Sequence, residues 1–492
     1  MKKLLIALLV LALPFSVFAK ELVIYHTSDT HGFFYPEKDP RNNRMWGGFA
    51  AVKNVVKKEA LPHIFLDSGD YSNGTAEVKN TKGKAAITMM NAMGYQATTI
   101  GNHEFDFGED NFLANIALFT FPVLNANVWD ARTKELLTGT APYKIFIVDG
   151  IKIAVIGIGK DGANKHFKFK NTISTIKKML PEIKTHNPDV IVLLIHDSYG
   201  DDREQKGVTN KLIAEKIPEI NVVLGGHAHK EYQNLYVGST LLAESGANLK
   251  TMSKIMITLD DKTGKYKSAS SQLISLYIDT VGEDAEIKTL AESLRIPGID
   301  TKLGSTAGEV SKFPVKDGCM DSPVNNWVAD LMAKHVRADF AMHNVGGARI
   351  SLPAGDITMR DMVTLFPFDN KIALVEVDGK FIKNLIRNSI KNGNRALYNF
   401  HGLTAKFKLK NKKVKNLEVF INGIPVDDKK TYTMVTNEYI ANGNTEGWMF
   451  KKIEDDKKTF VDMSIRGMLV DDLKEHSPLI PLNNECRLQV VK

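Results

Sequence analysis

Five clusters of Asp, His and Asn residues in the first half of the sequence carry the side chains best suited to chemistry. Each cluster directly follows a run of apolar residues. The candidate metal ligands among them are Asp29, His31, Asp70, Asn102, His196, His227 and His229. Carboxylate, imidazole and amide ligands suit borderline divalent ions such as Zn²⁺, Mn²⁺ or Fe²⁺. There are enough of them for two adjacent ions, which together can activate a water and hold a phosphoryl group for in-line displacement.

The apolar runs in front of these clusters predict the strands that position them. They lie at 22–25, 64–66, 97–100, 123–124, 152–158, 190–195 and 222–224. Amphipathic stretches at 48–59, 83–93 and 172–184 alternate with them and are expected to form helices. Such alternation favours a layered α/β domain. Because ligands bind at the carboxyl ends of strands in α/β sheets, the five clusters are expected to converge on one site if these strands share a sheet.

Taken together, the motifs resemble those of the calcineurin-like metallophosphoesterases, and among these the exported 5′-nucleotidases. The matching segments are Ser-Asp-Thr-His-Gly at 28–32, Gly-Asp at 69–70, Gly-Asn-His-Glu-Phe-Asp at 101–106, His196, and Gly-His-Ala-His at 226–229. They occur in order along the first half of the chain, which makes the combination far more specific than any single motif. The resemblance implies a layered αββα domain that binds two divalent metal ions.

The resemblance also implies a role for each of these residues. One ion would be held by Asp29, His31 and His229, the other by Asn102, His196 and His227, with Asp70 bridging both. His103 would be the catalytic histidine, in contact with the phosphate and its leaving oxygen, and Asp106 would orient it. A carboxylate that accepts one imidazole N–H keeps the ring oriented and favours its charged form. His26 is expected to be a buried residue, and Asp67 is expected either to support a ligand or to form a turn; neither is expected to be a ligand itself.

The second half of the sequence resembles the C-terminal domain of the same family. The matching segments are Asn-Val-Gly-Gly-Ala-Arg at 344–349, Phe-Pro-Phe-Asp-Asn at 366–370 and Tyr-Thr-Met-Val-Thr-Asn at 432–437. The resemblance implies that substrate is bound by Asn344, Gly347, Arg349, Asn370, Phe400 and Trp448. The last two would be rings that stack on the nucleobase, a contact that tolerates different bases. The loop at 443–448 is one residue longer than the family's Gly-Gly-Asp-Gly-aromatic segment, so base preference stays open.

The chain of 492 residues divides into four predicted segments. Residues 1–19 are expected to be an export signal, because two lysines precede an apolar stretch too short to cross a bilayer and small residues precede the cleavage point. A metallophosphoesterase domain is expected over 20–281, a polar linker helix over 282–300, and a separate α+β C-terminal nucleotidase domain over 301–492. Cys319 and Cys486 permit one disulfide in an exported protein.

These observations predict a periplasmic or secreted phosphohydrolase that releases phosphate from nucleoside 5′-monophosphates by attack of a metal-activated water. The expected partner is a small-molecule nucleotide. A net charge of +7 spread over the whole chain does not indicate a dedicated nucleic-acid partner, and no transmembrane span is expected after signal cleavage.

Other functions fit the same motifs. The same metal site also suits a 2′,3′-cyclic nucleotide phosphodiesterase, a nucleotide-sugar or dinucleotide pyrophosphatase, or a sulfate-releasing relative. The alternative outside enzymes is an inactive nucleotide-binding surface protein. The resident metal, whether Zn, Mn or Fe, and the oligomeric state are left open by the sequence.

Overall fold

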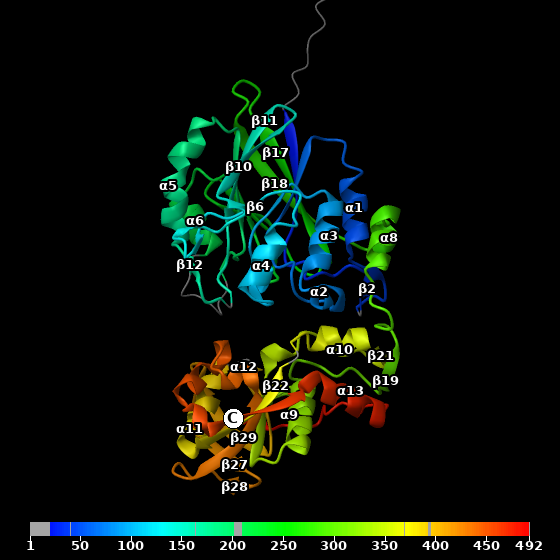
Figure 1. Ribbon diagram of the computed structural model, residues 1–492, viewed down its shortest axis with the longest axis vertical. Helices are drawn as coiled ribbons and strands as arrows, with labels where there is room; N and C mark the ends of the chain where they lie inside the picture. The colour runs from blue at the N-terminus through cyan, green and yellow to red at the C-terminus, as the bar shows by residue number, and fades with distance from the viewer. Residues whose placement is uncertain are drawn as a thin grey trace, which may run out of the picture. The chain divides into compact units, whose positions relative to one another are not determined.

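The computed structural model describes residues 20–39, 41–162, 164–200, 209–368, 370–391 and 395–491. The predicted export signal at 1–19 lies outside these residues. Contacts divide the chain into two units, which are drawn in Figure 1. The first unit extends to Leu294, and the second comprises Gly74–Ala76 and the residues from Arg295 onward. Each unit has hydrophobic cores of its own.

Two sheets form the centre of the first unit (Figure 1). The seven-stranded sheet has the order β18 (Tyr266–Ser275), β17 (Thr251–Leu259), β1 (Glu21–Thr27), β4 (His63–Asp67), β5 (Ala97–Thr98), β6 (Val123–Leu124), β9 (Thr140–Ala141). The six-stranded sheet has the order β10 (Tyr143–Val148), β11 (Ile151–Ile158), β13 (Val190–Ile195), β14 (Val222–Gly225), β16 (Thr240–Ser245), β15 (Glu231–Val237). Every strand predicted from the sequence forms. Within each sheet, the strands that precede a predicted site cluster run parallel.

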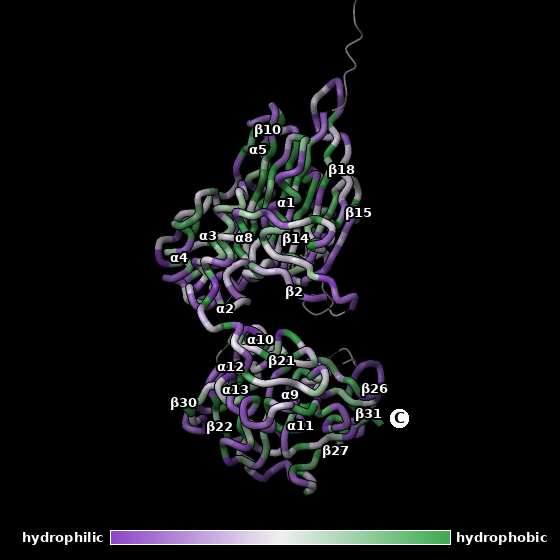
Figure 2. The backbone as a smooth tube through the Cα atoms, turned by 90° about the vertical axis from the view of Figure 1, so that its right-hand side faces the viewer, coloured by the Kyte–Doolittle hydropathy of each residue, from purple (hydrophilic) through white to green (hydrophobic). Residues whose placement is uncertain are grey.

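The two sheets pack face to face, and helices cover their outer faces. Leu22 and Leu66 of the larger sheet lie in one core with Val192 and Leu224 of the smaller sheet. The helices are α1 (Phe49–Val56), α3 (Lys84–Met93) and α8 (Ala285–Ser293) on the larger sheet, and α5 (Thr172–Thr185) and α6 (Asn210–Lys216) on the smaller. Figure 2 shows hydrophobic stretches running through the interior of this unit and hydrophilic ones on its outside. These are the αββα layers that the sequence predicts.

Shorter elements connect these layers. They are β2 (Glu37–Lys38), β3 (Met45–Trp46), α2 (Ala76–Asn80), α4 (Glu109–Ile116), β7 (Val128–Asp130), β8 (Glu135–Leu136), β12 (Phe167–Phe169) and α7 (Ile278–Val281).

The helix expected as a linker over 282–300 is a component of the first unit. It forms as α8, and the carboxylate of Asp284 caps its N-terminus by accepting the main-chain N–H groups of Glu286 and Ile287. Ile287 and Ala291, one helical turn apart, are buried in the core that contains α1 and α3. Because this apolar pair anchors α8, the division between the units falls after the helix, at Leu294.

The second unit combines a five-stranded and a four-stranded sheet with helices, the α+β arrangement that the sequence predicts. The five-stranded sheet has the order β25 (Tyr398–His401), β20 (Phe340–Asn344), β29 (Thr431–Asn437), β22 (Lys371–Asp378), β30 (Lys458–Ser464). The four-stranded sheet has the order β28 (Ile424–Pro425), β27 (Lys413–Ile421), β26 (Leu403–Lys410), β31 (Leu488–Val490). The helices are α9 (Pro323–His335), α10 (Met359–Leu365), α11 (Gly379–Ser389), α12 (Glu438–Ala441) and α13 (Ile465–Glu475). Two short two-stranded sheets pair β19 (Lys302–Thr306) with β21 (Gly355–Thr358) and β23 (Ile390–Lys391) with β24 (Arg395–Ala396).

A disulfide joins Cys319 to Cys486 within the second unit, with the two Cα atoms 5.4 Å apart. The pairing that the two cysteines permit is therefore present. It closes a long loop, and in the chain-entropy account a long closed loop stabilises the folded state by restricting the unfolded chain. Among the residues described, no helix has the length and apolar character needed to cross a bilayer.

Candidate metal and catalytic site

The predicted ligands lie together at the carboxyl ends of the parallel strands of the first unit. They form two groups, and within each group the ligand atoms lie within 4.8 Å of one another. One group is Asp29, His31 and His229; the other is Asp70, His196 and His227. The seventh predicted ligand, Asn102, has its Oδ1 2.8 Å from Nδ1 of His227. The groups adjoin, because Oδ1 of Asp29 is 3.8 Å from Nε2 of His196. The structure thus brings all seven side chains to one site from five strand ends.

The backbone at this site has an uncommon conformation. Five of the seven residues have a left-handed φ, between 47° and 73°: Asp29, His31, Asp70, His227 and His229. For a residue other than glycine this conformation costs about 1 kcal/mol or more and is found mostly at functional sites. Main-chain hydrogen bonds hold it, including those from the N–H of Asp29 to the carbonyl of Gly69 and from the N–H of His31 to the carbonyl of Asp70. The turns therefore direct these side chains toward the site, and the left-handed backbone that this requires has an energetic cost.

Two of the histidines are held by main-chain carbonyls. Nδ1 of His31 lies 2.7 Å from the carbonyl oxygen of Asn73, and Nδ1 of His196 lies 2.6 Å from that of Ser68. A carbonyl only accepts, so each ring donates through Nδ1 and turns Nε2 toward the site. Burial, aided by His229, lowers the pKa of His31 to about 3, which keeps this ring neutral. A neutral imidazole with a free Nε2 is the form that binds metal ions.

The carboxylates of the site are strongly acidic. Burial alone would raise the pKa of Asp29, but His196 and His229 outweigh it and lower the pKa to about 2. Burial would likewise raise the pKa of Asp70, and His196 is the main group that holds it well below its usual range. In return, Asp70 and Asp29 raise the pKa of His196 to about 10 against the effect of burial. Two ionised buried carboxylates thus draw positive charge into the site, which suits a cation.

The predicted catalytic pair lies beside these ligands. Nδ1 of His103 is 2.5 Å from Oδ2 of Asp106, and the His103 ring centroid is 5.3 Å from that of His31. The main-chain N–H of His103 donates to Oδ1 of Asp70 at 2.9 Å. Only 16% of the His103 side chain is exposed, so the ring is shielded but still reachable from solvent. Its Nε2 is the ring nitrogen not engaged by Asp106.

The sequence did not indicate two residues that support this site. Nδ2 of Asn73 donates to Oδ2 of Asp106 at 2.5 Å, while the carbonyl of Asn73 holds His31, so Asn73 links the catalytic pair to a ligand. Glu104 lies inside the quoted Gly-Asn-His-Glu motif, and its buried carboxylate accepts main-chain N–H groups of the loop at 70–72. Asn73 stands outside the quoted motifs, and only the three-dimensional contact identifies it.

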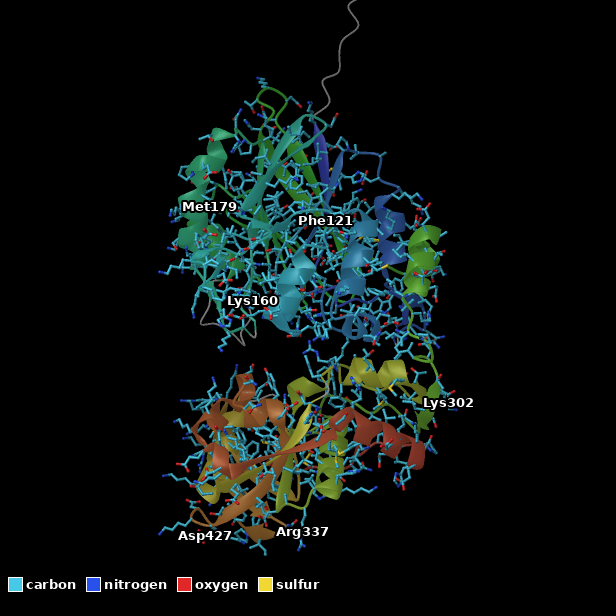
Figure 3. All side chains as sticks on the ribbon, viewed as in Figure 1. Phe121, Lys160, Met179, Lys302, Arg337 and Asp427 are labelled. Carbon is cyan, nitrogen blue, oxygen red and sulfur yellow. A yellow bond between two sulfur atoms is a disulfide. The ribbon has the colours of Figure 1, made fainter. Side chains whose placement is uncertain are left out.

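Neighbouring polar residues have structural contacts. Asp67 is fully buried and accepts the main-chain N–H of Gly69 and the hydroxyls of Thr27 and Thr98, as a turn-forming residue does. Lys160, labelled in Figure 3, lies at the end of the first unit that contains the carboxyl ends of the parallel strands. Its Nζ is 3.4 Å from Oδ2 of Asp197, the residue after His196. Lys160 thus adds a positive charge at the edge of the site.

In the second unit, four of the predicted substrate residues lie at one end of the five-stranded sheet. Asn344 ends β20, and Oδ1 of its side chain accepts Nδ2 of Asn437 at 2.7 Å. Gly347 and Arg349 follow it directly, and Asn370 precedes β22, which runs in the opposite direction to β20. The guanidinium carbon of Arg349 is 5.9 Å from the ring centroid of Phe368.

The two predicted stacking rings differ in exposure. Trp448 is 50% exposed, and its ring lines a pocket of about 510 Å³ together with Phe381 and Met449. Phe400, by contrast, is fully buried in the core of the second unit, 6.5 Å from Phe340 between ring centroids. A ring buried in the core offers no face to a base, so the burial of Phe400 does not support the prediction that it stacks there. Its position in β25 turns the side chain toward the core, because alternate residues of a strand point to opposite faces.

Comparison with known proteins agrees with both halves of this description. Residues 22–231 match the family model of the calcineurin-like phosphoesterases, and residues 302–452 match that of the 5′-nucleotidase C-terminal domain. The chain thus carries a calcineurin-like phosphoesterase domain followed by a 5′-nucleotidase C-terminal domain. It is a hydrolase of the metallophosphoesterase class, and calcineurin-like phosphoesterases use divalent metal ions. The pair of His and Asp groups described above fits that use.

Several known proteins are similar over almost their whole length. Protein UshA of Yersinia enterocolitica is 25% identical, over 93% of this chain and 92% of its own. The NAD 5′-nucleotidase of Haemophilus influenzae is 24% identical, over 89% of this chain and 87% of its own. The crystal structure of a 5′-nucleotidase precursor from Thermus thermophilus is similar in fold, with a TM-score of 0.82 at 24% identity, over 96% of this chain and 99% of that one.

Proposed function

We propose that this protein is a dinuclear metallophosphohydrolase that releases phosphate from nucleoside 5′-monophosphates. The observation that carries the proposal is the pair of adjoining His and Asp groups with the His103–Asp106 pair at their edge. When bound, two divalent ions supply an activated water and a clamp for the phosphoryl oxygens. The proposed ligands are Asp29, His31 and His229 for one ion, Asn102, His196 and His227 for the other, and Asp70 for both.

The remaining chemistry belongs to side chains of the protein. We assign to His103 the proton transfer at Nε2, toward the oxygen that leaves with the nucleoside. Asp106 fixes the ring through Nδ1 and favours the charged imidazolium, and Asn73 holds Asp106 from the other side. A positioned proton donor of this kind contributes about 10²–10⁴-fold to the rate of ester hydrolysis.

The second unit is proposed to bind the nucleoside. Asn344, Gly347, Arg349 and Asn370 stand at one end of its sheet, and Trp448 offers a half-exposed ring for stacking on a base. Arg349 is suited to oxygen acceptors because its guanidinium presents donors in a fixed geometry. With Phe400 removed from the set, Trp448 is the stacking residue in this proposal.

A second candidate activity is hydrolysis of a dinucleotide. It is favoured by the similarity to the NAD 5′-nucleotidase of Haemophilus influenzae, which is named for NAD. The same metal site would then cleave a pyrophosphate bond, with the distal nucleotide as the leaving group. Hydrolysis of a 2′,3′-cyclic nucleotide uses the same ligands and is tested alongside.

We also propose that the protein is exported to the periplasm or secreted, with residues 1–19 as the cleaved signal. The disulfide between Cys319 and Cys486 supports this, because disulfides persist in oxidising compartments. The test is fractionation of cells that express the full chain, followed by N-terminal sequencing. Export predicts a mature protein that begins at Lys20, and retention of residues 1–19 in the cytoplasm would rule the proposal out.

The activity itself is tested with a substrate panel. Phosphate release is measured from AMP and p-nitrophenyl phosphate, with and without added Mn²⁺ or Zn²⁺. For NAD, 2′,3′-cyclic AMP and UDP-glucose, the nucleoside monophosphate products are measured by chromatography, because cleavage of a pyrophosphate bond or a cyclic diester releases no free phosphate. The proposal expects the highest kcat/KM for AMP, with His103→Asn as the inactive control. A higher kcat/KM for NAD would favour the dinucleotide pyrophosphatase. Tight nucleotide binding with no turnover of any ester would favour a binding protein.

A further inference from the structure

One buried carboxylate joins two of the loops that form the metal site. Glu104 lies in the short 3₁₀ turn η1 (His103–Phe105) and is 1% exposed. Its Oε2 accepts the main-chain N–H of Asp70 at 3.1 Å and that of Gly101 at 2.5 Å. Its Oε1 accepts the N–H groups of Tyr71 at 3.0 Å and Ser72 at 3.1 Å. The side chain therefore takes four main-chain donors from two loops.

These contacts fix where the two loops meet. The loop at 70–72 turns all three of its N–H groups toward the same carboxylate while Asp70 has a φ of 58°. The other loop approaches so closely that a Cβ atom on Gly101 would lie 2.1 Å from Oδ1 of Asp70 and 2.7 Å from Oε2 of Glu104. That loop continues directly into Asn102 and His103. The Glu104 side chain thus fixes the position of Asp70 relative to both of them, together with the hydrogen bond from the N–H of His103 to Oδ1 of Asp70.

The chemistry of the four bonds calls for a carboxylate. An ionised carboxylate is an acceptor only, with about four lone-pair sites on its two oxygens, so four N–H donors match it fully. A carboxamide of the same shape offers one acceptor oxygen and turns two donors toward the remaining N–H groups. An aliphatic side chain would leave four buried donors without an acceptor.

We propose that Glu104 is a positioning residue that sets the distance of Asp70 from Asn102 and His103, and through it the affinity and geometry of the bound metal ions. The proposal rests on the metal-dependent function proposed above. Glu104 acts through the residues it holds and contacts neither a metal ion nor the substrate. Groups that support metal ligands in this way change metal affinity or activity by about 10- to 100-fold when they are replaced.

The test compares Glu104→Gln with the wild type, using Co²⁺ alone as the probe. Co²⁺ affinity is measured by titration of metal-free protein, and the visible absorption of bound Co²⁺ reports its coordination geometry. We expect Glu104→Gln to bind Co²⁺ roughly 10- to 100-fold more weakly, with an altered spectrum. In the Co²⁺-loaded enzyme, kcat for AMP should fall with little change in KM.

Glu244→Gln is the matched control, because Glu244 is also a buried glutamate of the first unit and its two hydrogen bonds, from the hydroxyl of Ser198 and the N–H of Tyr199, can both be kept by a carboxamide. It should bind Co²⁺ as the wild type does. If Glu104→Gln lowers only the melting temperature while the Co²⁺ affinity and spectrum match the wild type, Glu104 has a merely structural role and the proposal is overturned.

A second variant covers the case in which Glu104→Gln does not fold. Glu104→Asp keeps the carboxyl group but is shorter by one methylene and cannot reach all four donors, so its Co²⁺ affinity should also fall below that of the wild type. Equal affinity would overturn the proposal. The Co²⁺ titration needs no substrate. A failure of the proposed nucleotidase activity would therefore appear as wild-type Co²⁺ binding without AMP hydrolysis, and is distinguishable from a failure of this inference.

Discussion

His31 and His229 present their Nε2 atoms to each other across 3.1 Å. Because Nδ1 of His31 faces a carbonyl oxygen, its Nε2 carries a lone pair and no proton. Oδ1 of Asp29 is 3.4 Å from the same Nε2 of His229. Three electron-rich atoms thus gather around one point, and a cation there satisfies all of them at once.

Removal of metal should abolish hydrolysis and lower thermal stability. A ligand that binds only the folded protein stabilises it by about 1.4 kcal/mol for each tenfold excess over its dissociation constant. We therefore expect dialysis against a chelator to stop phosphate release from AMP and to lower the melting temperature of the first unit. Added Mn²⁺ or Zn²⁺ should reverse both effects. Full activity in a preparation shown by elemental analysis to be metal-free would refute the mechanism.

Asp70→Asn should be the most damaging ligand substitution, because a bridging carboxylate serves both ions. Metal content per chain, measured after gel filtration, should fall further than in variants of the other ligands. Asp110→Asn, an exposed carboxyl change in α4 of the same unit, serves as the control and should retain wild-type metal content. A variant of Asp29 that loses more metal than Asp70→Asn would contradict the bridging role.

His103→Asn should lower kcat by about 10²–10⁴-fold, the usual contribution of a positioned proton-transfer group. Metal content should stay near the wild-type value, since His103 is proposed as a catalyst and not as a ligand. Steady-state kinetics together with elemental analysis check both points. Loss of metal in parallel with activity would mean that His103 is a ligand.

Trp448→Ala should weaken the use of AMP and leave p-nitrophenyl phosphate almost unaffected. Stacking of a base on an aromatic ring contributes about 1–3 kcal/mol, so KM for AMP should rise roughly 5- to 150-fold. The small ester has no base to stack and serves as the internal control. Arg349→Ala should show the same selectivity, and Arg349→Lys should not restore it. An unchanged KM for AMP would mean that another residue contacts the base.

Phe400→Ala should behave differently from Trp448→Ala, because Phe400 is fully buried. Replacement of a buried Phe by Ala costs about 3–5 kcal/mol of folding free energy. Calorimetry should therefore show a less stable second unit, and activity toward the two substrates should be affected in equal proportion. A selective loss of AMP hydrolysis without loss of stability would restore Phe400 as a base-stacking residue.

Glu244→Gln should change how stability depends on pH. Burial raises the pKa of Glu244 from its ordinary value of 4.5 to about 8. Between these values the unfolded chain loses this proton and the folded protein keeps it, so Glu244 lowers stability as pH rises. The carboxamide carries no such penalty. The stability advantage of Glu244→Gln should thus grow from pH 4.5 to pH 8, by roughly 1.4 kcal/mol per pH unit. The check is calorimetry with chelator present. Curves of stability against pH that run parallel for the wild type and Glu244→Gln would contradict this prediction.

The sequence predicts the first unit well because its signals are local. A buried parallel strand appears in the sequence as a short apolar run, and the polar residue that follows it marks the sheet edge. The candidate ligands from Asp29 to His229 can therefore be found without coordinates. The contacts made by main-chain atoms carry no such signal. Neither the carbonyl of Asn73 on His31 nor the four N–H groups on Glu104 leave a pattern in side-chain types.

Two further expectations from the sequence differ from the structure because local patterns do not record long-range contacts. The prediction that Phe400 and Trp448 stack on the base rests on their positions in the motifs. A motif position does not state which face of a strand a side chain occupies, and Phe400 lies on the core face of β25. The apolar pair Ile287 and Ala291 is too sparse to mark 282–300 as a packed helix, yet it is enough to anchor α8. Long-range packing decides both cases, and a local pattern does not record it.

The position of β1 inside its sheet has a consequence for biosynthesis. One edge of this strand pairs with β4, at 63–67, whereas the partner of its other edge is β17, at 251–259, far later in the chain. An unpaired strand edge is a template for pairing with other chains. A nascent chain that ends just before β17 would therefore contain every candidate ligand and still expose an open edge beside them. Such an intermediate is prone to aggregate until nearly the whole first unit has been translated.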